Sequence, residues 1–447
     1  MSRPGSPPRP DATGREGSRT RRRVGDDGTT ALTGYVVLLL AIPSVYVIGP
    51  LGAAGAPAQV VAMALVLWWV GQGLARQYVP DPRRHPVRVA MLLFVAVVGV
   101  AYVVANLRPI DGAEARAADR GMLAVLGLLG VVLVADDRIP SRERLDVLLR
   151  RVVLAGAAVA TLGLAQFWTG LSFVEYLRLP GLTDNGGGFG VAERAGFLRP
   201  AGTAAHPIEF GVAIAMLFPL ALHYALTDEH RGRLVRWYPV AATALAIPVS
   251  VSRSAVLCLA LALLLMLPAM SRRARGLAVV GGVAMVGVVY VAVPGMLGAI
   301  LGLFTRIGVD TSAASRTDSY GLAAEFIARA PVFGRGLATF LPEYRILDNQ
   351  YLLITIELGV VGLAALLGLV VTGVVVARRV RRRAPDAATG QLAQALLASL
   401  VAGAASFALF DAFAFPKAAG LTFLVLGLIG GLDRLVPPRP VARPSPG

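Results

Sequence analysis

Long apolar runs alternate with short polar connections along almost the whole chain. The runs consist mostly of Leu, Val and Ala and lack the alternation of barrel strands, so we expect helices. A helix needs about 20 mostly apolar residues to cross a bilayer. The pattern predicts twelve spans with both termini inside, near residues 30–49, 57–75, 88–106, 121–135, 152–168, 207–226, 237–251, 254–270, 277–303, 350–376, 391–410 and 418–435. The runs at 121–135 and 237–251 are short, which indicates a tilted, re-entrant or misjudged segment.

This pattern predicts an all-α, polytopic integral membrane protein. Residues 30–435 form the expected transmembrane domain, because 56% of the chain is hydrophobic and its mean hydropathy is +0.67. Residues 1–29 are rich in Arg, Gly, Pro and Ser and predict a disordered basic cytoplasmic tail. Residues 436–447 predict a second cytoplasmic tail, and we find no internal repeat.

The distribution of charge orients the predicted spans. The connections on one side carry a net charge of +17 and the rest of the chain −1, which together give the net charge of +16. Cytoplasmic loops carry an excess of Lys and Arg, so the basic side is expected to lie inside. The high pI therefore reflects membrane orientation and does not indicate nucleic-acid binding. The two longest loops, 169–206 and 305–349, are expected to lie outside the cell.

Metal and thiol chemistry find little support in the sequence. Cys258 is the only cysteine and lies inside a predicted span, so a disulfide within the chain is excluded. The outer loops contain no Asp-x-Asp pair, and the four His residues are scattered. We therefore expect neither a metal site nor a cofactor. The first outer loop, 49–55, has no charge, which argues against enzymes with a catalytic acid there.

The larger outer loop predicts an amphipathic helix followed by a tight turn. Ser315 and Asp318 have the spacing of a capping box, and Pro331 is expected to stop the helix. The expected apolar face consists of Tyr320, Ala323, Phe326, Ile327 and Ala330. Beyond it, Gly334 and Gly336 flank Arg335 in a flexible, close-approach turn that would present a cation.

Two further segments place polar groups at the outer ends of spans. Arg199 precedes His206 and Pro207, and Pro207 suits a first helical turn, so His206 is expected at the helix cap. Arg253 lies where two apolar runs meet, at an outer interface or facing a polar cavity. Together with Arg316 these arginines converge on the outer side. Planar guanidinium groups that stay charged suit a dianion such as pyrophosphate.

With these segments the chain resembles the membrane glycosyltransferases of the O-antigen ligase and O-antigen polymerase superfamily. The resemblance rests on the order of five elements within residues 199–363. They are Arg199-x-x-Gly202 with His206-Pro207, Ser252-Arg253-Ser254, Ser315-Arg316, Pro331-x-x-Gly334-x-Gly336, and Asp348-Asn349-x-Tyr351-Leu352 followed by Glu357-Leu358-Gly359. The family often has His where this chain has Asp348.

The resemblance implies a metal-independent enzyme at the outer face of the plasma membrane. Its donor would be a polyprenyl-pyrophosphate-linked glycan, and its acceptor a sugar hydroxyl; other polysaccharide-assembly proteins are further candidate partners. The implied pyrophosphate ligands are Arg199, Arg253 and Arg316. Stabilising the departing charge would be their main contribution. Asp348 is the candidate base, and the candidate substrate-binding residues further include His206, Arg335, Asn349 and Glu357.

Each of these residues also has a structural reading. Arg199 and Arg253 could snorkel to the interface, and His206 could act only as a helix cap. Arg316 could only begin a helix, and Arg335 could be a solvated turn residue. Asp348 could be a plain N-cap of the next span, and Glu357 could make a structural hydrogen bond inside the bundle.

A non-enzymatic transporter is the alternative from another class, because twelve spans with both ends inside suit one. The absence of a long basic central loop between two six-span halves and the presence of a 45-residue outer loop argue against it. Within the enzyme reading, polymerase is favoured over ligase, because an Arg-rich, Lys-poor composition suggests a high-GC bacterium without lipopolysaccharide.

Overall fold

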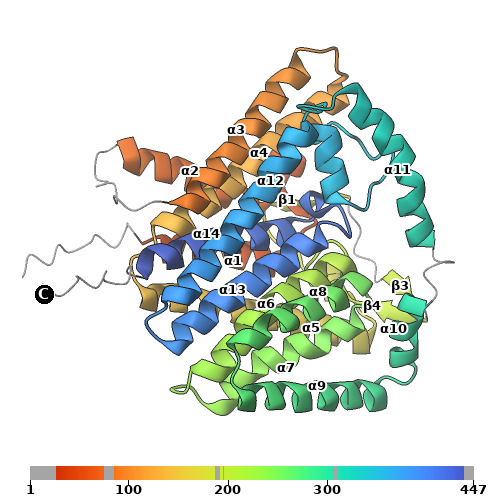
Figure 1. Cartoon of the computed structure of the whole chain (residues 1–447). Helices are drawn as coiled ribbons and strands as arrows, with labels where there is room; N and C mark the ends of the chain where they lie inside the picture. Colours follow the sequence, from red (N-terminus) through yellow and green to blue (C-terminus); the bar gives the residue numbers. More distant parts are fainter. Residues whose placement is uncertain (1–26, 75–84, 187–191, 195, 306–310, 437–447) are drawn as a thin grey trace, which may run out of the picture.

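The computed structural model describes residues 27–74, 85–186, 192–194, 196–305 and 311–436, and for residues 192, 303–304 and 311–318 it describes the backbone alone. This part of the chain is mostly helical, with two small sheets (Figure 1). The helices of the first half are α1 (Gly28–Ala41), α2 (Pro57–Leu74), α3 (Pro86–Asn106), α4 (Gly112–Asp137), α5 (Arg142–Thr169), α6 (Pro207–Thr227) and α7 (Arg233–Val249). Those of the second half are α8 (Arg253–Met266), α9 (Arg272–Ala292), α10 (Met296–Thr305), α11 (Thr311–Arg329), α12 (Gln350–Arg383), α13 (Ala387–Ser406) and α14 (Pro416–Leu435).

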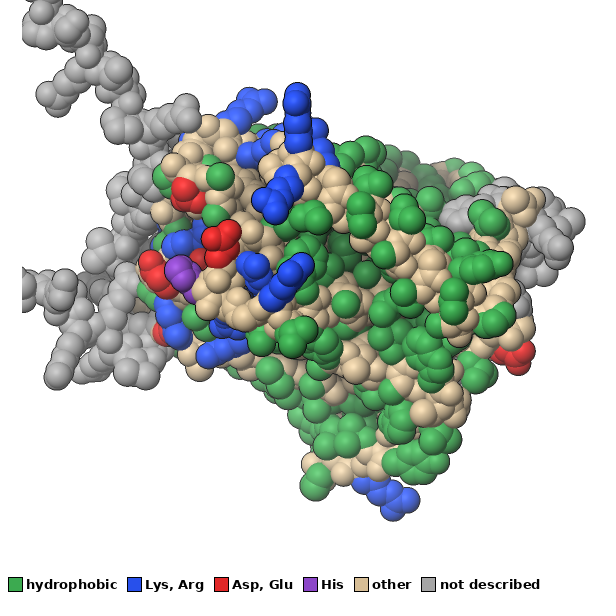
Figure 2. Space-filling model, turned by 90° about the horizontal axis from the view of Figure 1, so that it is seen from below, with side chains coloured by type: hydrophobic (Ala, Val, Ile, Leu, Met, Phe, Trp, Pro, Cys, Tyr) green, Lys and Arg blue, Asp and Glu red, His purple; other side chains and the backbone are tan. Residues whose placement is uncertain are grey.

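Nine helices of the described residues are long and apolar enough to cross a membrane: α2, α3, α4, α5, α6, α9, α12, α13 and α14. The shorter apolar helices α1 and α8 add to these, so the all-α membrane architecture is confirmed. A helix covers much of each of the twelve predicted runs, whereas the number of spans and their orientation remain proposals. Most charged side chains visible in Figure 2 gather at one end, and a broad hydrophobic surface covers the rest of this face.

Three sequence predictions about helix boundaries were wrong. The run at 277–303 is not one helix, because α9 ends at Ala292 and α10 begins at Met296, with Gly295 at φ +84° between them. The run at 121–135 belongs to the 26-residue α4, whose polar first turns lie before the apolar stretch. The helix in the large outer loop begins at Thr311, so Ser315 lies inside α11 and not at its cap. The predicted stop before Pro331 is confirmed, since α11 ends at Arg329.

Helices α6, α13 and α14 form the centre of the bundle. Small residues let α14 approach α4 closely: a Cβ on Gly427 would lie 2.7 Å from the Cβ of Ala135, and a Cβ on Gly431 only 2.4 Å from the carbonyl oxygen of Ala135. Such small residues four apart allow backbones to pack without large side chains between them. By contrast, α9 is exposed along most of its length, as expected of a helix at the lipid boundary.

Polar contacts close the predicted inner end of the bundle. The Arg142 guanidinium donates to Thr389 Oγ1 at 2.9 Å, and Arg150 Nε donates to Asp228 Oδ2 at 2.8 Å. Arg379 Nη2 reaches Asp433 Oδ2 at 2.7 Å. These contacts join connections that the charge pattern assigns to one side of the membrane.

The predicted outer connections likewise contact one another. The strand β1 (Tyr46–Ile48) pairs antiparallel with β2 (Leu182–Asp184), although more than 130 residues separate them in the chain. The second sheet pairs β3 (Ala192–Arg194) with β4 (Phe197–Arg199). Short 3-10 turns lie at Gly49–Ala54, Phe173–Tyr176, Leu267–Ala269 and Ala412–Ala414. A sheet therefore joins the connection after α1 to the loop 169–206 at the predicted outer end of the bundle.

Candidate functional site

Arg199 ends strand β4 and points into the protein. Its side chain is 6% exposed, and Nε donates to the carbonyl oxygen of Ser250 at 3.1 Å. Nη2 is buried and has no hydrogen-bond partner among the described residues. Burial, together with the neighbouring charge of Arg194, lowers the pKa of Arg199 to about 10, so the guanidinium stays charged at neutral pH.

The segment after Arg199 is held by a buried amide. Gln166 Nε2 donates to the carbonyl oxygen of Gly202 at 3.1 Å, and the Gly202 N–H donates to Gln166 Oε1 at 2.8 Å. Gly202 has φ +60°, and a Cβ there would lie 2.9 Å from the ring of Phe210. The glycine of the Arg-x-x-Gly element is therefore required by backbone conformation and by packing.

Arg253 follows a strained turn between α7 and α8. Val251 has φ +46°, which is uncommon for a β-branched residue, and its side chain is fully buried. Ser252 caps α8 by accepting from the Ala255 N–H at 3.4 Å, and Arg253 is the first residue of that helix. Because Arg199 binds Ser250, the structure brings Arg199 to the same turn as Arg253. Strained turns of this kind cluster at functional sites.

The predicted cap at His206 is confirmed. His206 Nδ1 accepts from the Ile208 N–H at 3.1 Å, and Pro207 occupies the first helical position of α6. Burial, followed by the charge of Arg199, lowers the pKa of His206 to about 4, so the ring is neutral at pH 7. The ring centroid lies 6.1 Å from that of Phe415, in the connection between α13 and α14.

Asn349, and not Asp348, caps α12. Asn349 Oδ1 accepts from the Leu352 N–H at 3.1 Å, so the reading of Asp348 as the helix cap was wrong. Asp348 lies instead close enough to Asp411 for the two carboxylates to repel each other. Burial, with a smaller contribution from Asp348, raises the pKa of Asp411 to about 6. Sequence reasoning missed Asp411, whose signal was an acid just before an outer span boundary.

The loop after α11 inserts its backbone into a break in α12. Gly359 has φ +67° and ψ −170°, which interrupts the helix. The Arg335 N–H donates to the carbonyl oxygen of Ile356 at 3.1 Å, the Gly336 N–H to that of Glu357 at 2.8 Å, and the Val360 N–H to that of Pro331 at 2.9 Å. Two separate elements of the resemblance, Pro331 to Gly336 and Glu357 to Gly359, are thus the two sides of one contact. The groups freed by the break are satisfied within protein, as membrane depth requires.

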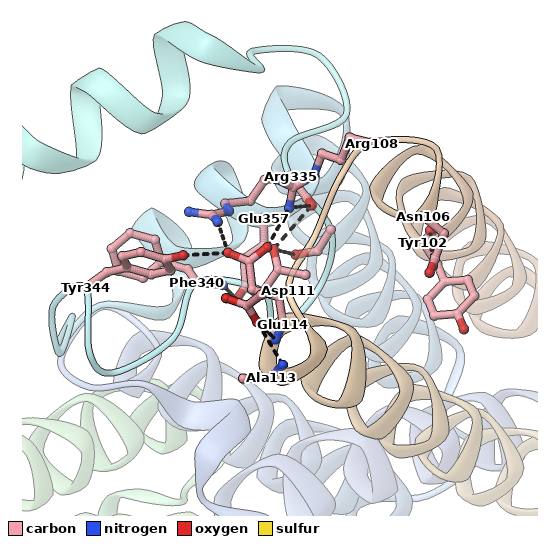
Figure 3. A network of polar contacts seen from close by, with 12 residues as sticks. Tyr102, Asn106, Arg108, Asp111, Ala113, Glu114, Arg335, Phe340, Tyr344 and Glu357 are labelled. Carbon is pink, nitrogen blue, oxygen red and sulfur yellow. Dashed lines mark hydrogen bonds and ion pairs between the residues drawn. The ribbon is translucent and has the colours of Figure 1, made fainter.

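Arg335 is held by a network with the start of α4 (Figure 3). Its guanidinium forms an ion pair with Glu114, whose carboxylate also accepts from the Tyr344 hydroxyl at 2.6 Å. Arg108 donates to the carbonyl oxygen of Arg335 at 2.7 Å. The guanidinium carbon of Arg335 lies 4.8 Å from the ring centroid of Tyr344 and 5.0 Å from that of Phe326. The structure therefore places Arg335 in an ion pair that holds the loop against α4. Sequence reasoning missed its partner Glu114, which lies 221 residues away in the chain.

Glu357 lies buried beneath this loop. Its Oε1 accepts from the Phe340 N–H at 3.3 Å, so the structural hydrogen bond that its sequence position allowed is present. The predicted apolar face of α11 is largely present as well: Ala323 is fully buried and Phe326 packs against Phe340 at a centroid distance of 5.0 Å. Tyr320 is the exception, at 51% exposed. The side chain of Arg316 lies outside the described residues.

A second buried pair, missed from the sequence, links α6 to α14. Glu209 accepts from the Ala205 N–H at 2.8 Å and from the Lys417 N–H at 2.6 Å. Lys417 Nζ donates to the carbonyl oxygen of Ile42 at 3.1 Å and to Ser44 Oγ at 2.9 Å. These contacts hold the start of α6, and with it His206, against α1 and α14.

The site therefore has a cationic side and an acidic side. Arg199 and Arg253 lie at the α7–α8 turn, with the neutral ring of His206 nearby. Asp348, Asp411 and Glu357 lie around the first turns of α12. The contact between the rings of His206 and Phe415 connects the two sides. Among the described residues, no group of three His, Cys, Asp or Glu side chains could hold a metal ion. The arrangement can bind an anion at one side and neutral hydroxyl groups at the other.

Residues 238–367 match the O-antigen ligase family. The matched segment runs from α7 into α12 and contains Arg253, Arg316, Arg335, Asp348 and Glu357, whereas Arg199 and His206 precede it. No curated protein matches the chain. The family match over residues 238–367, together with the membrane helices, supports membership of the O-antigen ligase and O-antigen polymerase superfamily.

Proposed function

We propose that this chain is a membrane glycosyltransferase that takes a glycan from a polyprenyl-pyrophosphate carrier at the outer face of the plasma membrane. The glycan is transferred to a sugar hydroxyl, with repeated polymerisation favoured over a single ligation. The family match supports a membrane enzyme of the O-antigen ligase or polymerase type with a lipid-linked glycan substrate. The proposal includes the polyprenyl-pyrophosphate carrier, the orientation of the protein in the membrane and the twelve spans. It also includes the division into a transmembrane domain at 30–435 and two cytoplasmic tails.

The buried guanidinium of Arg199 carries the proposal. A charged nitrogen that is buried without a partner is costly, and such groups persist where a ligand completes them. The charge that lowers the pKa of Arg199 belongs to another cation, Arg194, so an anion is the ligand that this environment favours. A pyrophosphate bound here would also face Arg253, and both guanidinium groups would stabilise the negative charge that develops as it leaves.

The acceptor side supplies the proton acceptor in this proposal. The acceptor hydroxyl oxygen attacks the anomeric carbon, the bond from that carbon to the pyrophosphate oxygen breaks, and its electron pair leaves with the pyrophosphate. The hydroxyl proton passes to the carboxylate of Asp348, which lies directly before the outer end of α12. Asn349 caps the helix that begins beside this carboxylate, Glu357 accepts from the Phe340 N–H in the preceding loop, and Arg335 ties that loop to α4.

Transfer by the purified protein in nanodiscs, with an undecaprenyl-pyrophosphate-linked glycan as donor, tests the proposal. Arg199→Lys keeps one charge but loses the planar fork, so we expect turnover to fall about 10- to 100-fold. Asp348→Asn should lower transfer roughly 10²- to 10⁴-fold while donor binding persists. The control is Arg382→Lys, at the exposed inner end of α12.

Three results would count against the proposal. Full turnover by Arg199→Lys would make that arginine a structural residue, and full turnover by Asp348→Asn would remove it as the base. No transfer by the wild-type protein, together with donor movement across vesicle membranes, would favour the transporter. A ladder of products indicates a polymerase, whereas addition of a single glycan indicates a ligase.

A further inference from the structure

The connection between α13 and α14 is tied to the first residue of α12. The Gln350 N–H donates to the carbonyl oxygen of Phe407 at 2.7 Å. Gln350 Oε1 accepts from the Phe413 N–H, also at 2.7 Å. The side-chain amide of Gln350 therefore points at the segment that contains Asp411.

Two buried polar atoms remain without hydrogen-bond partners in this part of the described structure: Nε2 of Gln350 and Oδ1 of Asp411. The Gln350 side chain is 1% exposed. The two groups lie close together because they share a partner. The Phe413 backbone that donates to Gln350 also donates to the Asp411 carboxylate, as does the backbone of Ala414. One atom is a donor and the other an acceptor, which is the combination that a sugar hydroxyl satisfies, since it donates one hydrogen bond and accepts others.

Aromatic residues are frequent in the connection that contains Asp411 and directly after Gln350. The Phe407 ring centroid lies 6.1 Å from that of Tyr351 and 5.8 Å from that of Phe413. Phe410 and Phe415 pack edge to face at 5.3 Å on the same connection. A few polar groups among aromatic side chains are typical of small-molecule sites, where the polar groups give orientation and the rings give contact area.

We propose that Gln350 and Asp411 form the subsite that binds a hydroxyl group of the acceptor sugar, one on each side of it. The inference rests on the proposed function and names the place where the acceptor binds. Asp348 lies two residues before Gln350, so a sugar held by this pair would have another hydroxyl within reach of the proposed base. Neither Gln350 nor Asp411 is thereby a catalytic residue in proton transfer; both position the acceptor.

The charges of the site favour a neutral ligand here. Asp348 acts on Asp411 as a like charge, and a diphosphate would be repelled by these two carboxylates. The donor pyrophosphate is therefore expected on the side of Arg199 and Arg253. Separate subsites for an anionic donor and a neutral acceptor would let one protein bind both substrates without competition between them.

Two substitutions test the subsite in the full-length protein in nanodiscs. Gln350→Glu keeps the oxygen that accepts from Phe413, replaces the free donor with a second carboxylate oxygen and adds a negative charge. Asp411→Asn keeps the shape of the side chain and removes its charge. The probe acceptor is the repeating-unit oligosaccharide, released from its carrier by mild acid, and the donor is the lipid-linked glycan. Each substitution should raise the KM for the probe acceptor about 10-fold, because one hydrogen bond to a bound hydroxyl is lost.

The KM for the donor should change less than twofold, which separates this subsite from the pyrophosphate site. The control is Asp386→Asn, a carboxylate-to-amide change at the N-cap of α13, where Asn caps equally well. An unchanged acceptor KM in both variants, with thermal stability alone altered, would show that the two atoms hold a buried water and would overturn the inference. A rise in the KM for the donor in both variants would overturn the inference as well. Transfer that still depends on Arg199 would leave the proposed function standing in either case.

Discussion

Gly359 is the position where the structure makes its sharpest stability prediction. Its φ of +67° and ψ of −170° lie in a region that is essentially restricted to glycine, so an alanine would add about 1–3 kcal/mol of backbone strain. An added Cβ would lie 2.2 Å from the carbonyl oxygen of Val332 and 2.3 Å from its carbonyl carbon. Both are backbone atoms, so no side-chain rotation relieves the contact.

Relief requires the loop to move away from α12. Four backbone hydrogen bonds join them, from Arg335 to Ile356, Gly336 to Glu357, Val360 to Pro331 and Val361 to Val332. Each contributes about 1 kcal/mol net, and losing half of them or more would add to the strain. For Gly359→Ala we therefore expect a loss of about 3–6 kcal/mol in the free energy of unfolding.

Equilibrium unfolding in mixed micelles of a mild detergent and SDS, followed by tryptophan fluorescence, measures this loss. Gly368→Ala is the matched control, because Gly368 lies in the same helix with no neighbouring atom within 4 Å of an added Cβ. That substitution should be neutral or stabilising by up to about 1 kcal/mol, since alanine is the better helix former. If Gly359→Ala unfolded within 1 kcal/mol of the wild type, the break in α12 would not depend on this glycine and the reasoning would fail.

Two further predictions concern pH and orientation. Burial lowers the pKa of His206 to about 4, so the stability due to its neutral ring is present above pH 6.5 and is lost as the pH falls towards 4. His206→Asn keeps a good cap without titrating, so the melting temperature of this variant should fall less than that of the wild type over this interval. Parallel curves of melting temperature against pH for the two proteins would contradict the role of His206. Single cysteines are placed at Leu177, in the predicted outer loop, and at Glu229, in a predicted inner connection, in a Cys258→Ser background. On intact cells an impermeant thiol reagent should label Leu177→Cys and not Glu229→Cys. Labelling of Glu229→Cys alone would reverse the orientation.

Local signals in the sequence predicted the helical membrane architecture well. Apolar runs of about 20 residues leave the backbone few alternatives in a bilayer, and a helix covers much of each predicted run. His206 followed by Pro207 predicted a cap that the structure confirms, because capping depends on residues next to each other in the chain. Local patterns failed at two places. The capping-box spacing at Ser315 lies inside α11 and not at its start, and the apolar run 277–303 is divided between α9 and α10 although its hydropathy is continuous.

The tertiary structure decided which candidate groups meet and which atoms lack partners. The sequence marked Arg335 as a cation on a turn, but its partner Glu114 lies 221 residues away and is identified only by the fold. The sequence placed Pro331 to Gly336 and Glu357 to Gly359 in separate segments, and only the folded chain shows that one closes a break in the other. Burial shifts the pKa values of Arg199 and Asp411, and a sequence does not specify burial residue by residue. Hydropathy and capping depend on near neighbours, so the sequence alone determined that the apolar runs are helices, although not all of their boundaries. Desolvation and pairing depend on distant segments, so only the packed structure determined the site.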